Sequence, residues 1–208
     1  MIDAEALAAD VSARWETALS AAAQPRLVPV GVATAARHTA RPESKHGSHV
    51  TRFGSAFGVT VHAALGLVLR SGLAVRVAVE RAAREAELAE HLDEACADVE
   101  RGLAAIRAAG LDRAASLELE YPVAGVGAAG QLLSGFIDLV AVLNGEVVIL
   151  DFKTDAPPTT ALGEAYPEYV EQVESYAQLV APIFGTKVIK KGLLFTADGG
   201  IRWIGESL

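Results

Sequence analysis

The chain has 208 residues, of which 51% are hydrophobic and 21% charged, a composition typical of a folded globular protein and not of a disordered one. The formal net charge of −8 argues against nonspecific binding of duplex nucleic acid by the whole chain, because Lys and Arg provide most of that affinity. No run approaches the ~20 apolar residues that span a bilayer, and the first residues do not resemble a secretory signal, so we expect a cytoplasmic protein without a membrane partner.

The first 52 residues are expected to extend the main domain. Residues 3–24 are rich in alanine and predict a helix. Residues 25–52 contain three prolines and several Ser and Thr without a clear period, which indicates a loop or a partly ordered strand. Five Lys or Arg and one acid lie in residues 26–52, so this segment is either an arm that contacts DNA or a disordered connector. We expect residues 53–208 to form a single globular unit.

Two helices are expected next, at about 55–70 and at about 74–109, separated by Ser71-Gly72 and ended near Gly110. The second helix carries many acids among alanines, which is typical of a solvated helix face. These acids are Glu80, Glu85, Glu87, Glu90, Asp93, Glu94, Asp98 and Glu100. They account for much of the excess of negative charge from Val61 onward, where there are 12 basic and 21 acidic residues.

The second half of the sequence alternates strands with one helix. Strands are expected near 116–123, where Pro122 ends the pattern, and then near 131–143 and 146–154. A helix at about 166–181 leads past Pro182 to a strand near 187–196, and a last short strand ends at Trp203. Three antiparallel strands followed by a helix and a fourth strand predict an α/β fold in which the fourth strand runs parallel to the third.

Asn144-Gly145 between two apolar runs predicts a tight β-hairpin, because both central residues of a type I′ turn require positive φ. If these residues form the whole loop, Leu143 pairs with Glu146, and Asp138 then lies opposite Asp151. Side chains alternate faces along a strand, so Lys153 lies on the same face as Asp151. The hairpin therefore predicts two facing carboxylates beside an amine.

Directly paired residues have Cβ atoms roughly 4.5–5.5 Å apart, so both carboxylates reach one ion. Two facing acids at the end of a buried strand would repel each other, and a divalent cation removes that penalty. Oxygen ligands favour Mg²⁺ or Mn²⁺, and Mg²⁺ often binds substrate phosphate as well. The pattern suggests metal-assisted phosphodiester hydrolysis. The alternative is a surface hairpin with solvated side chains, which an isolated D-x-K triplet would favour.

Four further positions allow both a functional and a purely structural interpretation. Gln172 and Tyr176 share a helix face and could hold a phosphate or a base, although an ordinary amphipathic helix, with Tyr169 in the core, is the better interpretation of this segment alone. His62 lies on an apolar helix that starts near Gly58, where a hydrogen-bonded core histidine is the simpler interpretation. Glu120 alternates with apolar residues, which usually means that it faces water.

Taken together, these segments resemble the RecB-type branch of the PD-(D/E)xK nucleases, and most closely the nuclease module at the C-terminal end of AddA/RecB-type helicase-nucleases. The resemblance covers roughly residues 50–195 and rests on five motifs in the expected order. They are Gly58 with His62, Glu120-Tyr121-Pro122, Gly135-Phe136-Ile137-Asp138, Asp151-Phe152-Lys153-Thr154, and Gln172-Val173-Glu174-Ser175-Tyr176. The resemblance implies a restriction-endonuclease-like α/β core, with a mixed central β-sheet flanked by helices.

The resemblance also implies roles for the matched residues. The side-chain metal ligands would be His62, Asp138 and Asp151, and the main-chain carbonyl of Phe152 would be a further ligand. Lys153 would position or activate the attacking water and offset charge in the transition state.

Gln172 and Tyr176 match a helix motif associated with the active site and with DNA. Glu120 matches an acidic position that would hold either a water of the metal or a second ion. Some relatives bind an iron–sulfur cluster through four cysteines, but Cys96 is the only cysteine of this chain, so we expect no such cluster.

The expected function is that of a Mg²⁺- or Mn²⁺-dependent deoxyribonuclease, either an exonuclease or a helicase-associated nuclease of DNA recombination and repair. Its partners would be DNA, including single-stranded ends, and a fused or associated helicase, because the sequence has no phosphate-binding loop for ATP. An inactive DNA-binding or protein-interaction module of the same fold is the main alternative. An enzyme acting on RNA or on a nucleotide is a third possibility.

Overall fold

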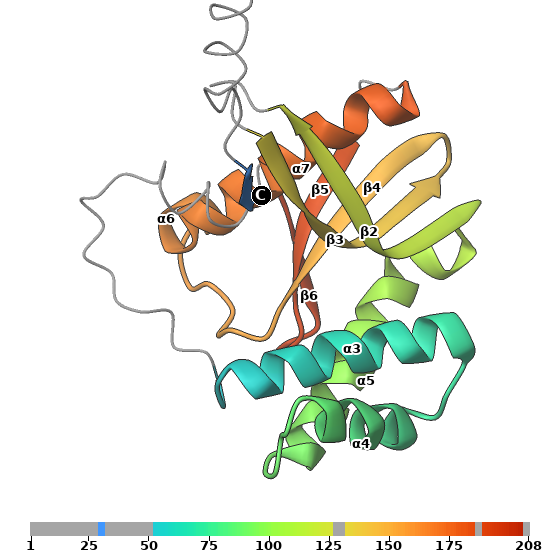
Figure 1. Cartoon of the computed structure of the whole chain (residues 1–208), viewed down its shortest axis with the longest axis vertical. Helices are drawn as coiled ribbons and strands as arrows, with labels where there is room; N and C mark the ends of the chain where they lie inside the picture. Colours follow the sequence, from blue (N-terminus) through green and yellow to red (C-terminus); the bar gives the residue numbers. More distant parts are fainter. Residues whose placement is uncertain (1–28, 32–51, 127–131, 186–188, 206–208) are drawn as a thin grey trace, which may run out of the picture.

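A mixed β-sheet forms the centre of the computed structural model, which describes residues 29–31, 52–126, 132–185 and 189–205 (Figure 1). Its six described strands are β1 (Pro29–Gly31), β2 (Ser116–Val126), β3 (Leu132–Leu143), β4 (Glu146–Lys153), β5 (Ile189–Phe195) and β6 (Gly200–Trp203). The described helices are α3 (Ser55–Ser71), α4 (Val75–Glu85), α5 (Leu92–Ala108), α6 (Leu162–Ala165) and α7 (Pro167–Phe184), with a 3₁₀ turn at Leu111–Arg113. None of the described helices is long and apolar enough to cross a membrane.

The sheet separates two apolar cores. On one face, α3 and α5 pack against sheet residues such as Leu139 and Leu150, α4 packs against these two helices, and Leu65 of α3 is fully buried there. On the other face, α7 packs through Val173 and its neighbours against residues that include Ile149. Figure 1 shows α3, α4 and α5 together on one side of the strands and α7 on the other. The predicted fold class, a mixed sheet flanked by helices, is therefore confirmed.

The β3–β4 hairpin has the predicted turn and register. Asn144 and Gly145 have φ values of 53° and 83°, as a type I′ turn requires. Leu143 pairs with Glu146, and the ladder continues to Leu139 opposite Leu150. Asp138 and Asp151 stand one step beyond that last pair. β5 pairs in parallel with β4, so the predicted crossover through α7 is also confirmed.

The β2–β3 ribbon rotates near Glu120 and Asp138, so that residues before and after this point face opposite sides of the sheet. Leu119 packs into the core of α3 and α5, whereas Tyr121, two residues later, packs against the core of α7. Between them Glu120 has a φ of 52°, and the ladder is interrupted between the pairs Leu119–Leu139 and Tyr121–Ile137. A positive φ is uncommon for a residue with a side chain, and here it marks the point where the strand rotates. The same point along β3 is Asp138.

The prediction of one helix at about 74–109 is wrong, because the structure has two helices in this region, α4 and α5. Glu87 and His91, between them, adopt φ values of 56° and 66°, which end a right-handed helix. An uninterrupted helix of that length would be about 54 Å long, and much of its apolar face would extend past the sheet. The break lets both helices pack against α3.

Several boundaries also differ from the sequence prediction. Pro122 does not end β2 but pairs with Phe136. Among the described strands β2 pairs only with β3, so its other edge is free, and a proline, which has no backbone N–H, costs no hydrogen bond on that edge. Helix α7 continues past Pro182 to Phe184, and α6 was not predicted. The helix expected at 3–24 and most of the segment 25–52 lie outside the described residues, apart from β1, which pairs in parallel with β3.

Candidate active site

Asp151 and Lys153 at the end of β4 form the centre of the candidate site. Their side chains are only 5% and 13% exposed, and Lys153 Nζ lies 2.6 Å from Asp151 Oδ2. The predicted placement of both groups on one face of the strand is thus seen in the structure. The ammonium faces Asp151 Oδ2, and no other described group donates a hydrogen bond to this buried oxygen. A buried carboxylate oxygen with unused acceptor capacity is suited to a cation.

Asp138 connects this strand end to helix α3. Its Oδ2 accepts a hydrogen bond of 2.6 Å from the backbone N–H of Phe152, and its Oδ1 lies 3.3 Å from His62 Nδ1. The His62 ring also packs edge-on against the Phe152 ring at 5.7 Å. The structure therefore brings together the two strand ends and the histidine that the sequence singled out.

The two acids have opposite electrostatic tendencies. Burial raises the pKa of Asp151, and the nearby charge of Asp138 adds to this, while Lys153 opposes it. Burial also acts on Asp138, but His62, the Phe152 N–H and Lys153 together hold the pKa of Asp138 below its ordinary value. Burial disfavours a charged His62, yet the adjacent Asp138 carboxylate outweighs it and raises the pKa of His62. Asp138 therefore keeps its negative charge to lower pH than Asp151 does.

Helix α7 supplies the amide and the phenol that the sequence predicted at this site. Gln172 Nε2 is 3.3 Å from Asp151 Oδ1, and Lys153 Nζ donates to Gln172 Oε1 at 3.3 Å. The same Nε2 donates to the Tyr176 hydroxyl at 3.2 Å. Burial raises the pKa of Tyr176 to about 12, so its phenol keeps its proton at neutral pH. An added Cβ at Gly135 would stand 3.1 Å from that hydroxyl, so the glycine leaves room for Tyr176.

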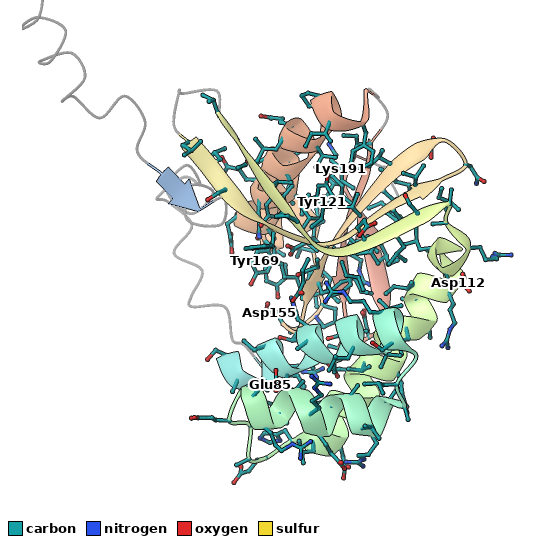
Figure 2. The ribbon with its side chains drawn as sticks, turned by 45° about the vertical axis from the view of Figure 1, so that its right-hand side comes forward. Glu85, Asp112, Tyr121, Asp155, Tyr169 and Lys191 are labelled. Carbon is teal, nitrogen blue, oxygen red and sulfur yellow. The ribbon has the colours of Figure 1, made fainter. Side chains whose placement is uncertain are left out.

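Tyr169 and Asp155 belong to the candidate site but were not identified as site residues from the sequence, where Tyr169 entered only as a core residue of the structural alternative; it does pack against the core of α7. Lys153 Nζ lies 3.8 Å from the centre of the Tyr169 ring, a cation–π distance. The Tyr169 hydroxyl donates to Asp155 Oδ2 at 2.9 Å, and Figure 2 labels the two residues near each other. The available signal was spacing, because Tyr169 precedes Gln172 by one helical turn.

Glu120 lies near this cluster but not in it. Its side chain is 64% exposed and pairs with Arg70 at 3.0 Å. Arg70 also donates to the Leu119 carbonyl at 2.6 Å, so the ion pair is fixed at the edge of β2. Both residues line a groove of about 460 Å³ that His62 and Asp138 also border.

Asp98 was expected on a solvated helix face, and this is wrong, because its side chain is fully buried. It accepts hydrogen bonds from Arg52 at 2.8 Å, from the Thr196 hydroxyl at 2.7 Å and from Arg101. The Thr196 N–H in turn donates to the Lys153 carbonyl at 2.9 Å. Asp98 therefore helps to fix the end of β4 from the α5 side.

The donor chemistry of the cluster suits a hard divalent cation. Among the described residues, no group of three or more His, Cys, Asp or Glu side chains is arranged to hold a metal ion as it stands. The reason is visible in the contacts, since Lys153 stands beside Asp151 Oδ2 and Asp138 is turned toward His62. Two carboxylates with waters are nevertheless a common Mg²⁺ environment. An imidazole that contacts a carboxylate through one nitrogen also offers the other to a metal.

Comparison with known proteins gave two findings. A family model described as the PD-(D/E)XK nuclease superfamily matches residues 34–201. A stretch of 64 residues is 41% identical to an ATP-dependent helicase/nuclease protein of Carboxydothermus hydrogenoformans. That match covers 31% of this chain and 6% of the relative, so the chain spans only a small part of the length of the curated protein to which it is similar.

Proposed function

The chain belongs to the PD-(D/E)XK nuclease superfamily, and we propose that it is a metal-dependent deoxyribonuclease that hydrolyses phosphodiester bonds. The observation that carries the proposal is the largely buried cluster of Asp138, Asp151 and Lys153, whose side chains are 20%, 5% and 13% exposed, at the ends of β3 and β4, contacted by His62 and Gln172. An acid pair and an amine buried together are costly for stability, so such a cluster points to chemistry.

Bound Mg²⁺ or Mn²⁺ would supply Lewis-acid polarisation of the phosphate and a more acidic water. Asp138 and Asp151 would hold the ion, with His62 and the Phe152 carbonyl as further ligands. Lys153 orients the attacking water and stabilises the charge that develops as the water oxygen bonds to phosphorus and the bond to the leaving sugar oxygen breaks. No side chain acts as a covalent nucleophile.

The residues of α7 support this step. Gln172 contacts both Asp151 and Lys153, so it fixes the distance between the acid and the amine. Tyr176, kept as a neutral phenol, is able to donate a hydrogen bond to a phosphate oxygen. Glu120 lies farther out and would act through a water or a second ion.

The biological setting that we propose is DNA recombination and repair, in company with a helicase. The similar protein from Carboxydothermus hydrogenoformans is named as part of a helicase/nuclease. The net charge of −8 gives little intrinsic attraction for a polyanion, so a fused or associated motor would deliver the DNA.

Digestion of linear single- and double-stranded DNA in Mg²⁺, Mn²⁺ or EDTA tests the proposal, with Asp151→Ala and Lys153→Ala beside the wild-type chain. We expect cleavage that needs the metal and falls by at least about a hundredfold in both variants. Asp112→Ala, far from the site, is the control and should cleave normally. Unchanged cleavage by Asp151→Ala would eliminate the proposed site. DNA binding without any cleavage by the wild type would favour an inactive module instead.

A further inference from the structure

A groove runs from the candidate site along helix α3. It lies between α3 and the β2–β3 ribbon, has a volume of about 460 Å³, and begins at His62 and Asp138. This volume is in the range of ~300–1,000 Å³ that is typical of small-ligand sites. Because the groove starts at two residues of the catalytic cluster, whatever occupies it lies next to the scissile phosphate.

Phe136 borders this groove and is unusually exposed. Its side chain is 65% exposed, the highest value among the large hydrophobic residues that the structure describes as exposed. It stands two residues before Asp138 on β3. Leaving a phenylalanine in water forgoes a large part of its burial energy, whereas an aromatic face beside a phosphate-handling site is suited to stacking on a base.

Gly66 keeps the floor of the groove open. It is a buried residue in the middle of α3, yet a Cβ added there would meet nothing within 4 Å. Glycine inside a helix lowers stability relative to alanine, and at this position no close packing requires it. The space over Gly66 therefore belongs to the groove.

Arg70 closes the far end, one helical turn beyond Gly66. Its guanidinium is fixed to the Leu119 carbonyl at 2.6 Å and to Glu120 at 3.0 Å, while its side chain remains 49% exposed. The groove thus has a candidate metal-site acid and a histidine at one end, an aromatic ring on its wall, and at the other end Arg70 with its ion-pair partner Glu120, which also lines the groove.

We propose that this groove is a nucleotide subsite, in which the base next to the scissile phosphate stacks on Phe136 and a neighbouring backbone phosphate contacts Arg70. The inference rests on the proposed nuclease function. A base that lies on a protein ring cannot also stay stacked in a duplex, so the nucleotide in the groove is unpaired.

Substitutions that fill or strip the groove without disturbing the fold provide the test. Gly66→Leu places a side chain into open space and should leave the thermal midpoint equal or higher, with Gly66→Ala as the matched control. Phe136→Ala removes the ring, and Val77→Ala, at an exposed apolar residue of α4, is its control. Binding of a fluorescent single-stranded oligonucleotide in Mg²⁺ is measured with each variant combined with Lys153→Ala, so that the oligonucleotide is not cleaved. KM for cleavage is measured with the same variants carrying the native Lys153.

We expect Gly66→Leu and Phe136→Ala each to weaken oligonucleotide binding by about tenfold or more and to raise KM, while both controls bind normally. The wild-type chain should bind an oligonucleotide that lacks the base at the cleavage site more weakly than the intact oligonucleotide. Phe136→Ala should bind these two oligonucleotides with equal affinity. Normal binding and KM in Gly66→Leu and Phe136→Ala would overturn the subsite. Binding that depends on Phe136 without metal-dependent cleavage would instead overturn the nuclease proposal alone.

Discussion

At the scale of single residues, the position of the Lys153 ammonium is fixed by three contacts. Asp151 Oδ2 lies at 2.6 Å, Gln172 Oε1 at 3.3 Å and the Tyr169 ring centre at 3.8 Å. One contact comes from β4 itself and the other two come from α7. A group held from two elements is positioned before substrate arrives, which is the requirement for stabilising charge in a transition state.

The Tyr169 ring, and not its hydroxyl, should be the part that Lys153 needs. We expect Tyr169→Ala to lower kcat for DNA cleavage by more than about tenfold with little change in KM, because the cation loses its aromatic contact. Tyr169→Phe keeps the ring and should retain most of the activity. Steady-state kinetics of the two variants check this, and equal losses in both would show that the contact is unimportant.

Asp151 should destabilise the metal-free fold at neutral pH. Burial raises its pKa above the unfolded value, so folding favours the protonated acid, and that contribution to stability disappears as the pH rises through the raised pKa. Asp151→Asn, which imitates the protonated form, should therefore raise the thermal midpoint in EDTA at pH 7. The difference should shrink as the pH is lowered through that pKa.

Thermal unfolding of both chains across that pH range is the measurement. Asp112→Asn removes a partly exposed charge and should change little at any pH. A lower midpoint for Asp151→Asn at pH 7 would contradict the assignment of the burial penalty to Asp151.

At the scale of elements, the β3–β4 hairpin decides where the acids meet. Its register follows from the two turn residues, Asn144 and Gly145, because a two-residue loop leaves only one pairing for the strands. This local rule is why the strands and the placement of Asp151 beside Lys153 were predictable from the sequence.

Gly145→Ala should destabilise the protein by about 1–2 kcal/mol, because φ at this position is 83° and a Cβ is strained there. Gly163→Ala in α6 is the matched control, since its Cβ would meet nothing within 4 Å and its φ is ordinary. Urea denaturation of both variants measures the difference. Equal stabilities would show that the turn does not require glycine.

Features that depend on distant parts of the chain were not predictable. The break between α4 and α5 has no Gly or Pro to mark it, and it follows from the length of the face that α3 offers. Asp98 looks like its acidic neighbours in sequence, but its partners Arg52 and Thr196 are 46 and 98 residues away. Tyr169 has the helical position of a core residue, and only the folded strand shows that it lies against Lys153.

At the scale of the whole molecule, the site depends on both layers of helices. α7 contacts the candidate cluster from one face of the sheet, and α3 reaches it through His62 from the other. The buried Asp98 joins α5 to Thr196, whose N–H binds the Lys153 carbonyl. An error in the packing of either layer would therefore displace the end of β4.

Asp98→Ala should lower the free energy of unfolding by about 3–5 kcal/mol, because it leaves Arg52 and Arg101 without their buried carboxylate partner. Asp93→Ala is the control, because Asp93 pairs with Arg76 at the surface, where its side chain is 84% exposed, and water screens such pairs so that they contribute little to stability. Urea unfolding measures both variants. Similar losses in the two would contradict the structural role of Asp98.

The central claim is that Asp138 and Asp151 share one divalent cation beside Lys153. Anomalous diffraction from crystals of the whole chain grown with Mn²⁺ tests it directly. We predict one strong manganese peak at roughly 2.1 Å from a carboxylate oxygen of each acid, and no such peak in crystals of Asp151→Ala. Manganese bound elsewhere, with neither carboxylate among its ligands, would contradict the account.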